Sequence, residues 1–303
     1  MSENSSENKK ITIITHSGKF HADDIFAVAT LLLLLGEEAS VSVIRSRDEE
    51  IIKSGDYVVD VGGVYDPDKN RFDHHQQEGA GIRNNTVPYA SFGLVWKKFG
   101  ETICGLHEVS ERIDHILVQP IDMADNGRSY IETSIPGLYP YDIGLFFNAF
   151  TPSWKETEMD IDTVFMEVVQ LARIVLTREI SKRKDLANVR SIIENIYKES
   201  LNKKLIVLDQ FYPVGEVLSK FPEPLFVVFP REDGIWAIKT IRNDENSFIN
   251  RKDLPKDWAG KKDEEFETVT GVVGAVFCHK GLFLAGAKTK EAILQLAEIA
   301  LNS

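Results

Sequence analysis

The feature that most constrains the fold is the alternation of strand-like and helix-like segments between residues 11 and 63. Residues 11–15 (ITIIT) form a short β-branched run, which is typical of a strand buried on both faces. The segment IFAVATLLLLL then predicts a helix that ends at Gly36. The runs ASVSVIRS and YVVDVGG predict two more strands, with RDEEIIKSG as a helix or turn between them. This alternation predicts an α/β fold with a mostly parallel sheet and helices on both faces.

The rest of the chain predicts a second, smaller α/β domain. Residues 155–200 carry apolar side chains at helical spacing and predict long connector helices. Four runs, LIVLDQ, LFVVFP, WAIKTIR and VVGAVFC, then predict strands, and a further strand and a closing helix follow. We therefore expect a disordered leader over residues 1–10, a main domain with the connector helices over residues 11–202, and a C-terminal domain over residues 203–303.

Bulk properties limit the classes of partner. The 303 residues carry a formal net charge of −12, which disfavours nonspecific binding to nucleic acid or anionic membranes but allows local binding of a polyanion through bound cations. Cys104 and Cys278 are far apart and predict two buried, reduced thiols in a reducing compartment. The longest apolar run, residues 25–35, is too short to cross a bilayer. With no signal or transit peptide visible, we expect a cytoplasmic protein.

Acidic and imidazole side chains follow the predicted strands. His16 comes directly after the first strand, and His21 and Asp23 follow in the turn THSGKFHADD. Asp60 closes the strand YVVD, where a buried carboxylate needs a partner. Because the carboxyl ends of parallel strands meet at one edge of a sheet, we expect these groups to converge there. The alternative is that Asp23 or Asp24 only caps the following helix and that Asp60 belongs to a turn.

Two later segments supply further candidates of the same kind. Asp73, His74 and His75 follow the turn DPDKNRF, and Asp122 and Asp125 follow the stretch IDHILVQPI, which we interpret as a fourth strand end. Consecutive imidazoles can divide their roles, since one can bind metal while the other faces substrate, and Asp73 can orient a ring. Ordinary polar turns are the alternative for both segments, above all for ADNG, because Asn-Gly is a common turn pair.

The charge of such a cluster predicts bound metal. If one aspartate from each of the four segments reached the same point, the carboxylates would repel and some would take up protons. Two divalent cations would cancel this charge, and cations about 3.5–4 Å apart activate water and stabilise the leaving oxygen in phosphoryl transfer. Mixed imidazole and carboxylate ligands suit Mn, Fe or Zn, whereas Mg prefers oxygen ligands. No P-loop, dinucleotide fingerprint or G-x-S-x-G motif points to another chemistry.

Four motifs in fixed order carry a resemblance to a known family. THSGKFHADD, VVDVGG, FDHHQ and PIDMADNG resemble the DHH phosphoesterase superfamily, and within it the metal-dependent hydrolase family named after the melanocyte proliferating gene. LPKDWAGKKDEEF and FCHKGLFLAGAKTKEAIL are similar to the later motifs of that family, so the resemblance covers nearly the whole chain. One departure is that many superfamily members carry Asp-x-Asp in the first motif, where this chain has His21-Ala22-Asp23.

The resemblance implies a DHH-type catalytic domain over residues 11–202, a substrate-binding domain over residues 203–303, and a metal site near the cleft between them. It implies two divalent cations, Mn²⁺ in the first place with Mg²⁺ as the alternative. The implied metal ligands are His16, His21, Asp23, Asp60 and His74, with Asp122 or Asp125 completing the set. The other implied roles are Asp60 as the bridging carboxylate, His75 as the catalytic residue that faces the scissile phosphate, and His279, Lys288 and Thr289 as contacts to the substrate phosphate or terminus. Asp73 is counted as catalytic with His75, whose ring it can orient.

Three functions from different classes remain open on the sequence. The first is a metal-dependent 3′-to-5′ exonuclease on RNA or short oligonucleotides, the activity of characterised relatives. The second is hydrolysis of a small phosphate compound such as pyrophosphate or a dinucleotide, which the acidic net charge favours. The third is a non-catalytic, metal-stabilised regulatory protein, for which Asp60→Ala would remove metal without removing any turnover. No membrane partner is expected, and the oligomeric state is left open, with a homodimer as one option.

Overall fold

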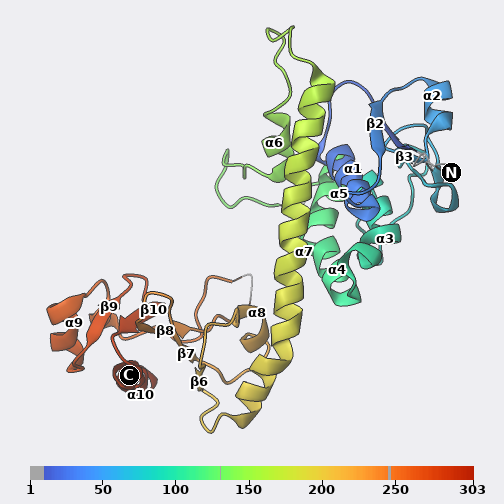
Figure 1. Ribbon diagram of the computed structural model, residues 1–303. Helices are drawn as coiled ribbons and strands as arrows, with labels where there is room; N and C mark the ends of the chain where they lie inside the picture. Colours follow the sequence, from blue (N-terminus) through green and yellow to red (C-terminus); the bar gives the residue numbers. More distant parts are fainter. Residues whose placement is uncertain (1–9, 130, 245–246) are drawn as a thin grey trace, which may run out of the picture. The chain divides into compact units, whose positions relative to one another are not determined.

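The computed structural model describes residues 10–129, 131–244 and 247–303 (Figure 1). Nearly all of the leader expected over residues 1–10 lies outside the described residues. Among the helices described, none combines the length and the apolar character needed to cross a membrane. Cys104 and Cys278 are buried free thiols, as the sequence predicted.

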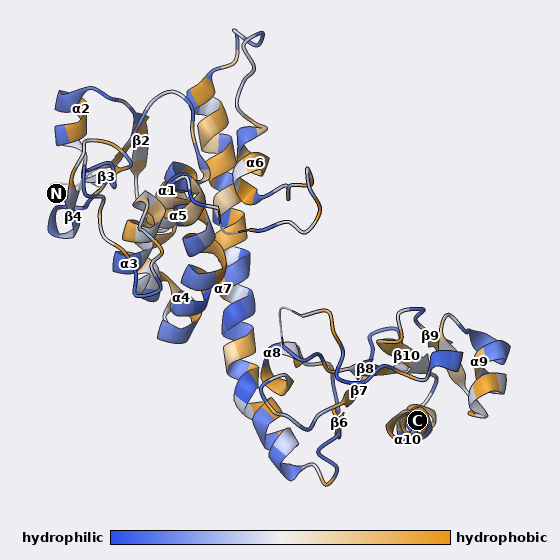
Figure 2. Cartoon of the chain, turned by 180° about the vertical axis from the view of Figure 1, so that it is seen from behind, coloured by the Kyte–Doolittle hydropathy of each residue, from blue (hydrophilic) through white to orange (hydrophobic). Residues whose placement is uncertain are grey.

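The chain forms two compact units, Met1–Lys184 and Asp185–Ser303. Helix α7 (Ile161–Glu199) runs from the first into the second as one helix of 39 residues, where the sequence predicted connector helices. Hydrophobic residues occur along both of its halves (Figure 2). The second unit begins inside α7 because Leu186 and Ile193 are buried in its core, whereas the sequence placed the domain boundary near residue 202.

The first unit contains a mostly parallel sheet. Its strands, in spatial order, are β2 (Val41–Arg45), β1 (Ile11–Thr15), β3 (Tyr57–Val59), β5 (Arg71–Phe72) and β4 (Tyr65–Asp66). Strand β1 pairs in parallel with both β2 and β3, β3 pairs in parallel with β5, and only the edge strand β4 is antiparallel. The β-branched side chains Ile13 and Ile14 are fully buried, which explains why ITIIT becomes a central strand.

The order of these strands creates a site for polar groups. The chain passes from β1 to β2 on one side and then returns to β3 on the other side of β1, so the direction of winding changes between β1 and β3. In open α/β sheets, ligands bind outside the carboxyl ends of the strands at such a switch point. His16 follows β1 and Asp60 follows β3, so both lie at this switch point.

Helices α1 (Ala22–Leu35), α2 (Glu49–Ser54) and α3 (Ser91–Cys104) contact this sheet. Helices α4 (His107–Ile113), α5 (Gln119–Asp125) and α6 (Ile143–Asn148) pack against α1 or α3, and the first part of α7 reaches Arg45 of β2 through Asp162. The core between them is aromatic: the Phe26 ring of α1 stacks on Phe92 of α3 at 5.2 Å and meets Phe147 of α6 edge-on at 5.6 Å.

The stretch IDHILVQPI is helical, so the expectation that a strand end precedes Asp122 and Asp125 is wrong. A π-helical turn, η2 (Asp114–Val118), joins α4 to α5. The β-branched residues of this stretch resemble a strand, but its buried side chains, with Val109 of α4 before them, recur at helical spacing. Those of the stretch itself are Ile113, Val118 and Ile121.

The second unit has a largely antiparallel sheet. Its strands, in spatial order, are β6 (Leu205–Val207), β7 (Phe226–Pro230), β8 (Trp236–Thr240), β10 (Leu284–Ala287) and β9 (Ala275–Cys278). Only β6 and β7 are parallel. The helices of this unit beyond α7 are α8 (Gly215–Leu218), α9 (Asp263–Thr270) and α10 (Lys290–Asn302). Helix α10 packs on β7 to β10 and buries its apolar face there.

Candidate metal centre

The first group of potential ligands lies at the switch point of the parallel sheet. It consists of His16, His21, Asp24 and Asp60, each with one ligand atom within 4.8 Å of the others. The Nε2 atom of His16 lies 3.2 Å from Asp24 Oδ2 and 3.3 Å from Asp60 Oδ2. His16, Asp24 and Asp60 are buried, so one imidazole and two carboxylates share a site that excludes most water.

A second group lies beside the first. It consists of Asp23, His74 and Asp125, whose ligand atoms again lie within 4.8 Å of one another. The Nε2 atom of His74 lies 3.0 Å from Asp125 Oδ2 and 3.5 Å from Asp60 Oδ1. Asp23 is fixed in place because its two oxygens accept the N–H groups of Ser91 at 3.0 Å and Phe92 at 2.7 Å, at the start of α3.

Asp60 belongs to both groups. Its Oδ2 faces His16, and its Oδ1 faces His74, so one carboxylate spans the two ligand sets. Its backbone has φ 56°, in the left-handed region that Asp and Asn tolerate better than most side chains. This conformation turns the chain sharply after β3, and Ser91 Oγ donates a hydrogen bond to Asp60 Oδ1 at 3.3 Å.

Several atoms of this cluster fit cation ligands better than hydrogen-bonding groups. Among the described residues, the buried atoms without a hydrogen-bond partner include His16 Nε2, His74 Nε2 and Asp24 Oδ2. Buried polar atoms are rarely left unpaired. Ligands about 2.1 Å from one cation and at angles of about 90–110° lie about 3.0–3.4 Å apart, which matches the separations found here. The residues therefore fit two divalent cations.

The electrostatics lead to the same conclusion. Burial raises the pKa of Asp24 to about 7, and burial together with the charges of Asp125 and Asp60 raises the pKa of Asp23 well above its usual value. Burial opposes protonation of His74, but the carboxylates of Asp125 and Asp60 outweigh it and raise its pKa to about 11. Without cations the cluster must therefore hold protons, and divalent cations would replace them.

The structure separates the two candidates in the segment DMADNG, Asp122 and Asp125. Asp125 joins His74 and Asp23, whereas Asp122 is fully buried and pairs with Arg83, whose Nη1 donates to Asp122 Oδ2 at 2.6 Å. Asp122 Oδ1 also accepts the N–H of Gly93 at 3.1 Å. Of the two, Asp122 is therefore already paired in the core, and only Asp125 lies in a group of potential metal ligands.

Asp73 and His75 form a pair next to the second group. Asp73 Oδ1 lies 2.7 Å from His75 Nδ1 and accepts the backbone N–H of His75 at 3.1 Å, while its Oδ2 accepts the N–H of Gly63. Asp73 is buried, and the His75 side chain is 62% exposed. Asp73 thus orients the imidazole of His75, whose Nδ1 also lies 3.4 Å from Asp60 Oδ1 while most of the ring is exposed.

A cavity of about 530 Å³ opens over the cluster. His16, His21, Asp60, His75 and Asp125 contribute to its lining. Among the described residues that line it, Arg47 is the only lysine or arginine, and its Nε donates to the backbone oxygen of Ser17 at 3.4 Å. A molecule that reached the potential ligands through this cavity would therefore meet one guanidinium group at its wall.

The structure does not bring the three C-terminal candidates together. His279 follows β9 at the turn of the β9–β10 hairpin, and Lys288 and Thr289 follow β10 at its other end. The paired strands between them span about 13 Å at about 3.3 Å per residue. Thr289 is the N-cap of α10, since its Oγ1 accepts the N–H of Ala292 at 3.2 Å. His279 accepts the N–H of Gly281 through Nδ1 at 3.0 Å.

Sequence reasoning missed two residues of the site. Asp24 belongs to the turn THSGKFHADD but is absent from the predicted ligands; it accepts the N–H of His21 at 2.7 Å, as a helix cap would, and its second oxygen faces His16. The available signal was the pair of adjacent aspartates at the start of a helix. Successive helical residues point in different directions, so the two carboxylates can reach two different sites. Arg47 carried no motif, and only the paired strands β1 and β2 bring it to the cavity.

The separation of Asp122 from Asp125 leads to a testable difference. Loss of a residue that only hydrogen-bonds to a metal ligand lowers metal affinity by about 10–100-fold. We expect Asp125→Ala to weaken cation binding by more than this. We expect Asp122→Asn to retain its cations and to unfold at a lower temperature, because Arg83 loses its buried partner. Metal content after dialysis and thermal unfolding of both variants check this, and the reverse pattern would assign the ligand to Asp122.

Comparisons with known proteins agree with the extent of the fold. A family model named MYG1_exonuc and described as "Uncharacterised protein family (UPF0160)" matches residues 12–301. The MYG1 protein of Dictyostelium discoideum is 31% identical, over 96% of this chain and 97% of that protein. The MYG1 exonuclease of Homo sapiens is 28% identical, over 95% of this chain and 85% of that protein. The chain therefore belongs to the MYG1 family (UPF0160), the narrower of the two families that its motifs resemble.

Proposed function

We propose that this chain is a two-metal phosphodiester hydrolase of the DHH type that acts as a 3′-to-5′ exonuclease on RNA or short oligonucleotides. One observation carries the proposal: Asp60 directs one carboxylate oxygen at each of two adjacent, mostly buried sets of potential ligands, beneath an open cavity. Sites of this kind with paired cations are used in phosphoryl transfer. The name MYG1 exonuclease, which the mouse and human relatives carry, supports the nuclease assignment.

The side chains around the cavity suit this reaction. When bound, two divalent cations supply an activated water molecule and positive charge at the phosphate. Asp73 holds Nδ1 of His75, so Nε2 of that ring is the atom that can exchange a proton with the leaving oxygen. Arg47 can bind a non-bridging phosphate oxygen through a charge-assisted hydrogen bond. His279 and Lys288 remain proposed contacts to the substrate, at separate points of the second unit.

Manganese is the cation that we propose. The first group offers two imidazoles and two carboxylates, and the second offers one imidazole and two carboxylates besides the shared Asp60. Mg²⁺ prefers an all-oxygen set and retains water, whereas Mn²⁺ accepts imidazole together with carboxylate. Cysteine ligands, which favour zinc in structural sites, are not among the described groups.

The test is hydrolysis of RNA by the purified full chain. The protein is stripped with chelator and supplied with Mn²⁺ or Mg²⁺, and RNA labelled at its 5′ end is followed on a gel. A 3′-to-5′ exonuclease gives a ladder that shortens with time, and Mn²⁺ restores more activity than Mg²⁺. Retention of full activity in chelator would contradict the two-metal mechanism, and cleavage at internal sites would contradict the exonuclease.

Hydrolysis of a small phosphate compound is the second candidate. The net charge of −12 favours it, because a strongly acidic surface repels long polyanions. Pyrophosphate and a dinucleotide therefore serve as parallel substrates in the same assay. Turnover of either compound with no shortening of RNA would replace the exonuclease by this alternative.

Arg47 gives a prediction specific to the substrate side of the cavity. We expect Arg47→Ala to raise the KM for RNA by about tenfold or more, since a hydrogen bond to a charged group is lost, and to change kcat less. Lys53→Ala, which removes an exposed cation of α2 outside the cavity, is the matched control. Steady-state kinetics that show the same KM for both variants would remove Arg47 from the substrate site.

A further inference from the structure

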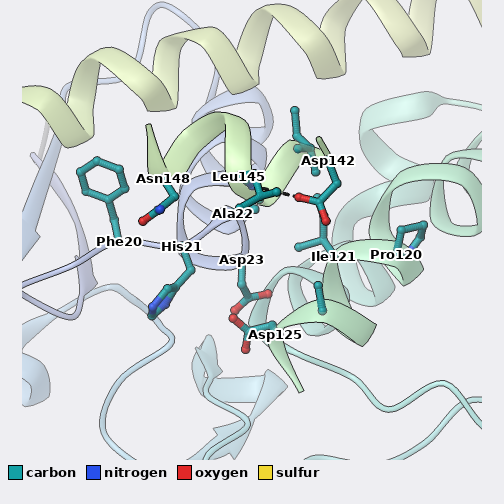
Figure 3. Close-up of a pocket in the computed structure, with 13 residues that line it drawn as sticks. Phe20, His21, Ala22, Asp23, Pro120, Ile121, Asp125, Asp142, Leu145 and Asn148 are labelled. Carbon is teal, nitrogen blue, oxygen red and sulfur yellow. Dashed lines mark hydrogen bonds between the residues drawn. The ribbon is translucent and has the colours of Figure 1, made fainter. Parts of the chain in front are cut away.

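A second, smaller cavity shares residues with the metal centre. It has a volume of about 240 Å³ and lies among the N-terminus of α1, helix α5 and helix α6 (Figure 3). His21, Asp23, Ala124 and Asp125 contribute to its lining. In Figure 3, the carboxylates of Asp23 and Asp125 lie at one side of this cavity, and α6 lies across from them. A group bound here would therefore be next to the second set of metal ligands.

The walls of this cavity are mostly apolar. They are formed by Phe20, Pro120, Ile121, Ile143 and Leu145. Asn148 adds one carboxamide, which points toward Phe20 and His21 in Figure 3. The Asp142 carboxylate is used locally, since its Oδ1 caps α6 by accepting the N–H of Leu145 at 2.9 Å. The cavity thus offers a mostly apolar space with one side chain, Asn148, that can both donate and accept a hydrogen bond.

We propose that this cavity binds the base of the terminal nucleotide while the adjoining phosphate lies at the metal ligands. The inference rests on the proposed function and names the part of the substrate that the cavity recognises. Its volume is below the about 300–1,000 Å³ of cavities for drug-sized ligands, so it suits one ring system rather than stacked nucleotides. A site for a single base next to the scissile phosphate explains removal of one nucleotide at a time.

Other parts of a nucleotide fit this cavity less well. Among the described residues that line it there is no lysine or arginine, so a phosphate would meet carboxylates without a counter-charge. A ribose presents hydroxyl groups on every side, and most of the lining could not pair with them. A base presents two apolar faces to the walls and a polar edge to Asn148. Because one carboxamide can pair with the edges of several bases, we expect little selectivity among them.

Binding of the reaction product tests the inference without relying on turnover. The Mn²⁺-loaded full chain is titrated calorimetrically with adenosine 5′-monophosphate and with ribose 5-phosphate, which lacks the base. We expect the nucleotide to bind about tenfold more tightly, the size of effect expected when a base packs in a protein site. Equal affinities for the two compounds, or no measurable binding of either, would overturn the inference.

Two variants locate the base within the molecule. Leu145→Trp fills the cavity from an exposed position on α6, and Asn148→Ala removes the carboxamide from another exposed position of that helix, so both should fold. We expect Leu145→Trp to reduce the preference for the nucleotide to about twofold or less and Asn148→Ala to reduce it by about fivefold. Leu138→Trp, at an exposed leucine that does not line the cavity, should keep the preference.

The variants also separate this inference from the proposed function. If RNA is hydrolysed and Leu145→Trp retains the wild-type preference, the base binds elsewhere and only the inference fails. If no phosphodiester is hydrolysed and yet Leu145→Trp abolishes a preference for the nucleotide, the cavity binds a base but the exonuclease proposal fails.

Discussion

Asp60→Asn is expected to abolish hydrolysis and to lower the metal content from two cations per chain to one or none. Asn has the size of Asp and tolerates the left-handed backbone found at this position, so the fold of the turn after β3 should survive. The substitution removes the charge that the two ligand groups share. Loss of a single transition-state contact costs about 10²–10³ in kcat, and loss of the shared ligand should cost more.

The control for this prediction is Asp48→Asn. Asp48 is an exposed N-cap of α2, and Asn caps a helix equally well, so this variant should keep both metal and activity. Metal analysis and RNA hydrolysis on the same preparations decide the outcome. An Asp60→Asn protein with two cations and full activity would falsify the shared-ligand assignment. A wild-type protein that binds two cations but hydrolyses no phosphate ester would favour the non-catalytic alternative.

The position of the site at the sheet edge could be predicted from sequence because parallel topology fixes it. Once β1 and β3 are recognised as parallel strands, His16 and Asp60 must lie at the same edge of the sheet. His74 follows β5, which pairs with β3, and so reaches the same edge. These placements need only the order of the strands and the side on which each one ends.

The distribution of ligands between the two groups could not be predicted, because it depends on side-chain direction on helices. Asp23 and Asp24 are neighbours, but Asp23 faces the start of α3 and Asp24 faces His16. Asp122 and Asp125 lie on the same helix, and only the position of Arg83 decides which of them is already paired. Arg83 lies 39 residues from Asp122 in the chain, so no local pattern could indicate the pair.

The strand predicted at IDHILVQPI was wrong for a related reason. Isoleucine and valine favour strands, and IDHILVQPI contains four such residues. Tertiary packing favours a helix here instead, because α4, η2 and α5 bury one apolar stripe against α1 and α3. Strand propensity is a weak indicator where a helix can bury the same side chains.

Arg83→Leu is expected to reduce the free energy of unfolding of the first unit by about 3–5 kcal/mol, the usual cost of breaking a buried ion pair from one side. Arg83 donates to Asp122 at 2.6 Å and to Asp114 at 2.8 Å, and its side chain is 8% exposed. Its guanidinium also lies 4.0 Å from the centre of the Tyr89 ring. Leucine restores apolar volume but leaves the buried carboxylate of Asp122 without a counter-charge.

Hydrogen exchange of α3 and α5 in increasing denaturant measures this loss in the first unit alone. The control is Lys53→Leu, which breaks an exposed ion pair with Glu50 and should cost about 0–1 kcal/mol.

Burial raises the pKa of Asp122 to about 7, even though Arg83 acts to lower it, so removal of Arg83 raises it further. A carboxyl with a raised pKa in the folded state loses stability as the pH rises through that pKa. The loss of unfolding free energy in Arg83→Leu should therefore grow above about pH 7. If this loss were no larger than that of Lys53→Leu at any pH, the pair with Asp122 would contribute little to stability.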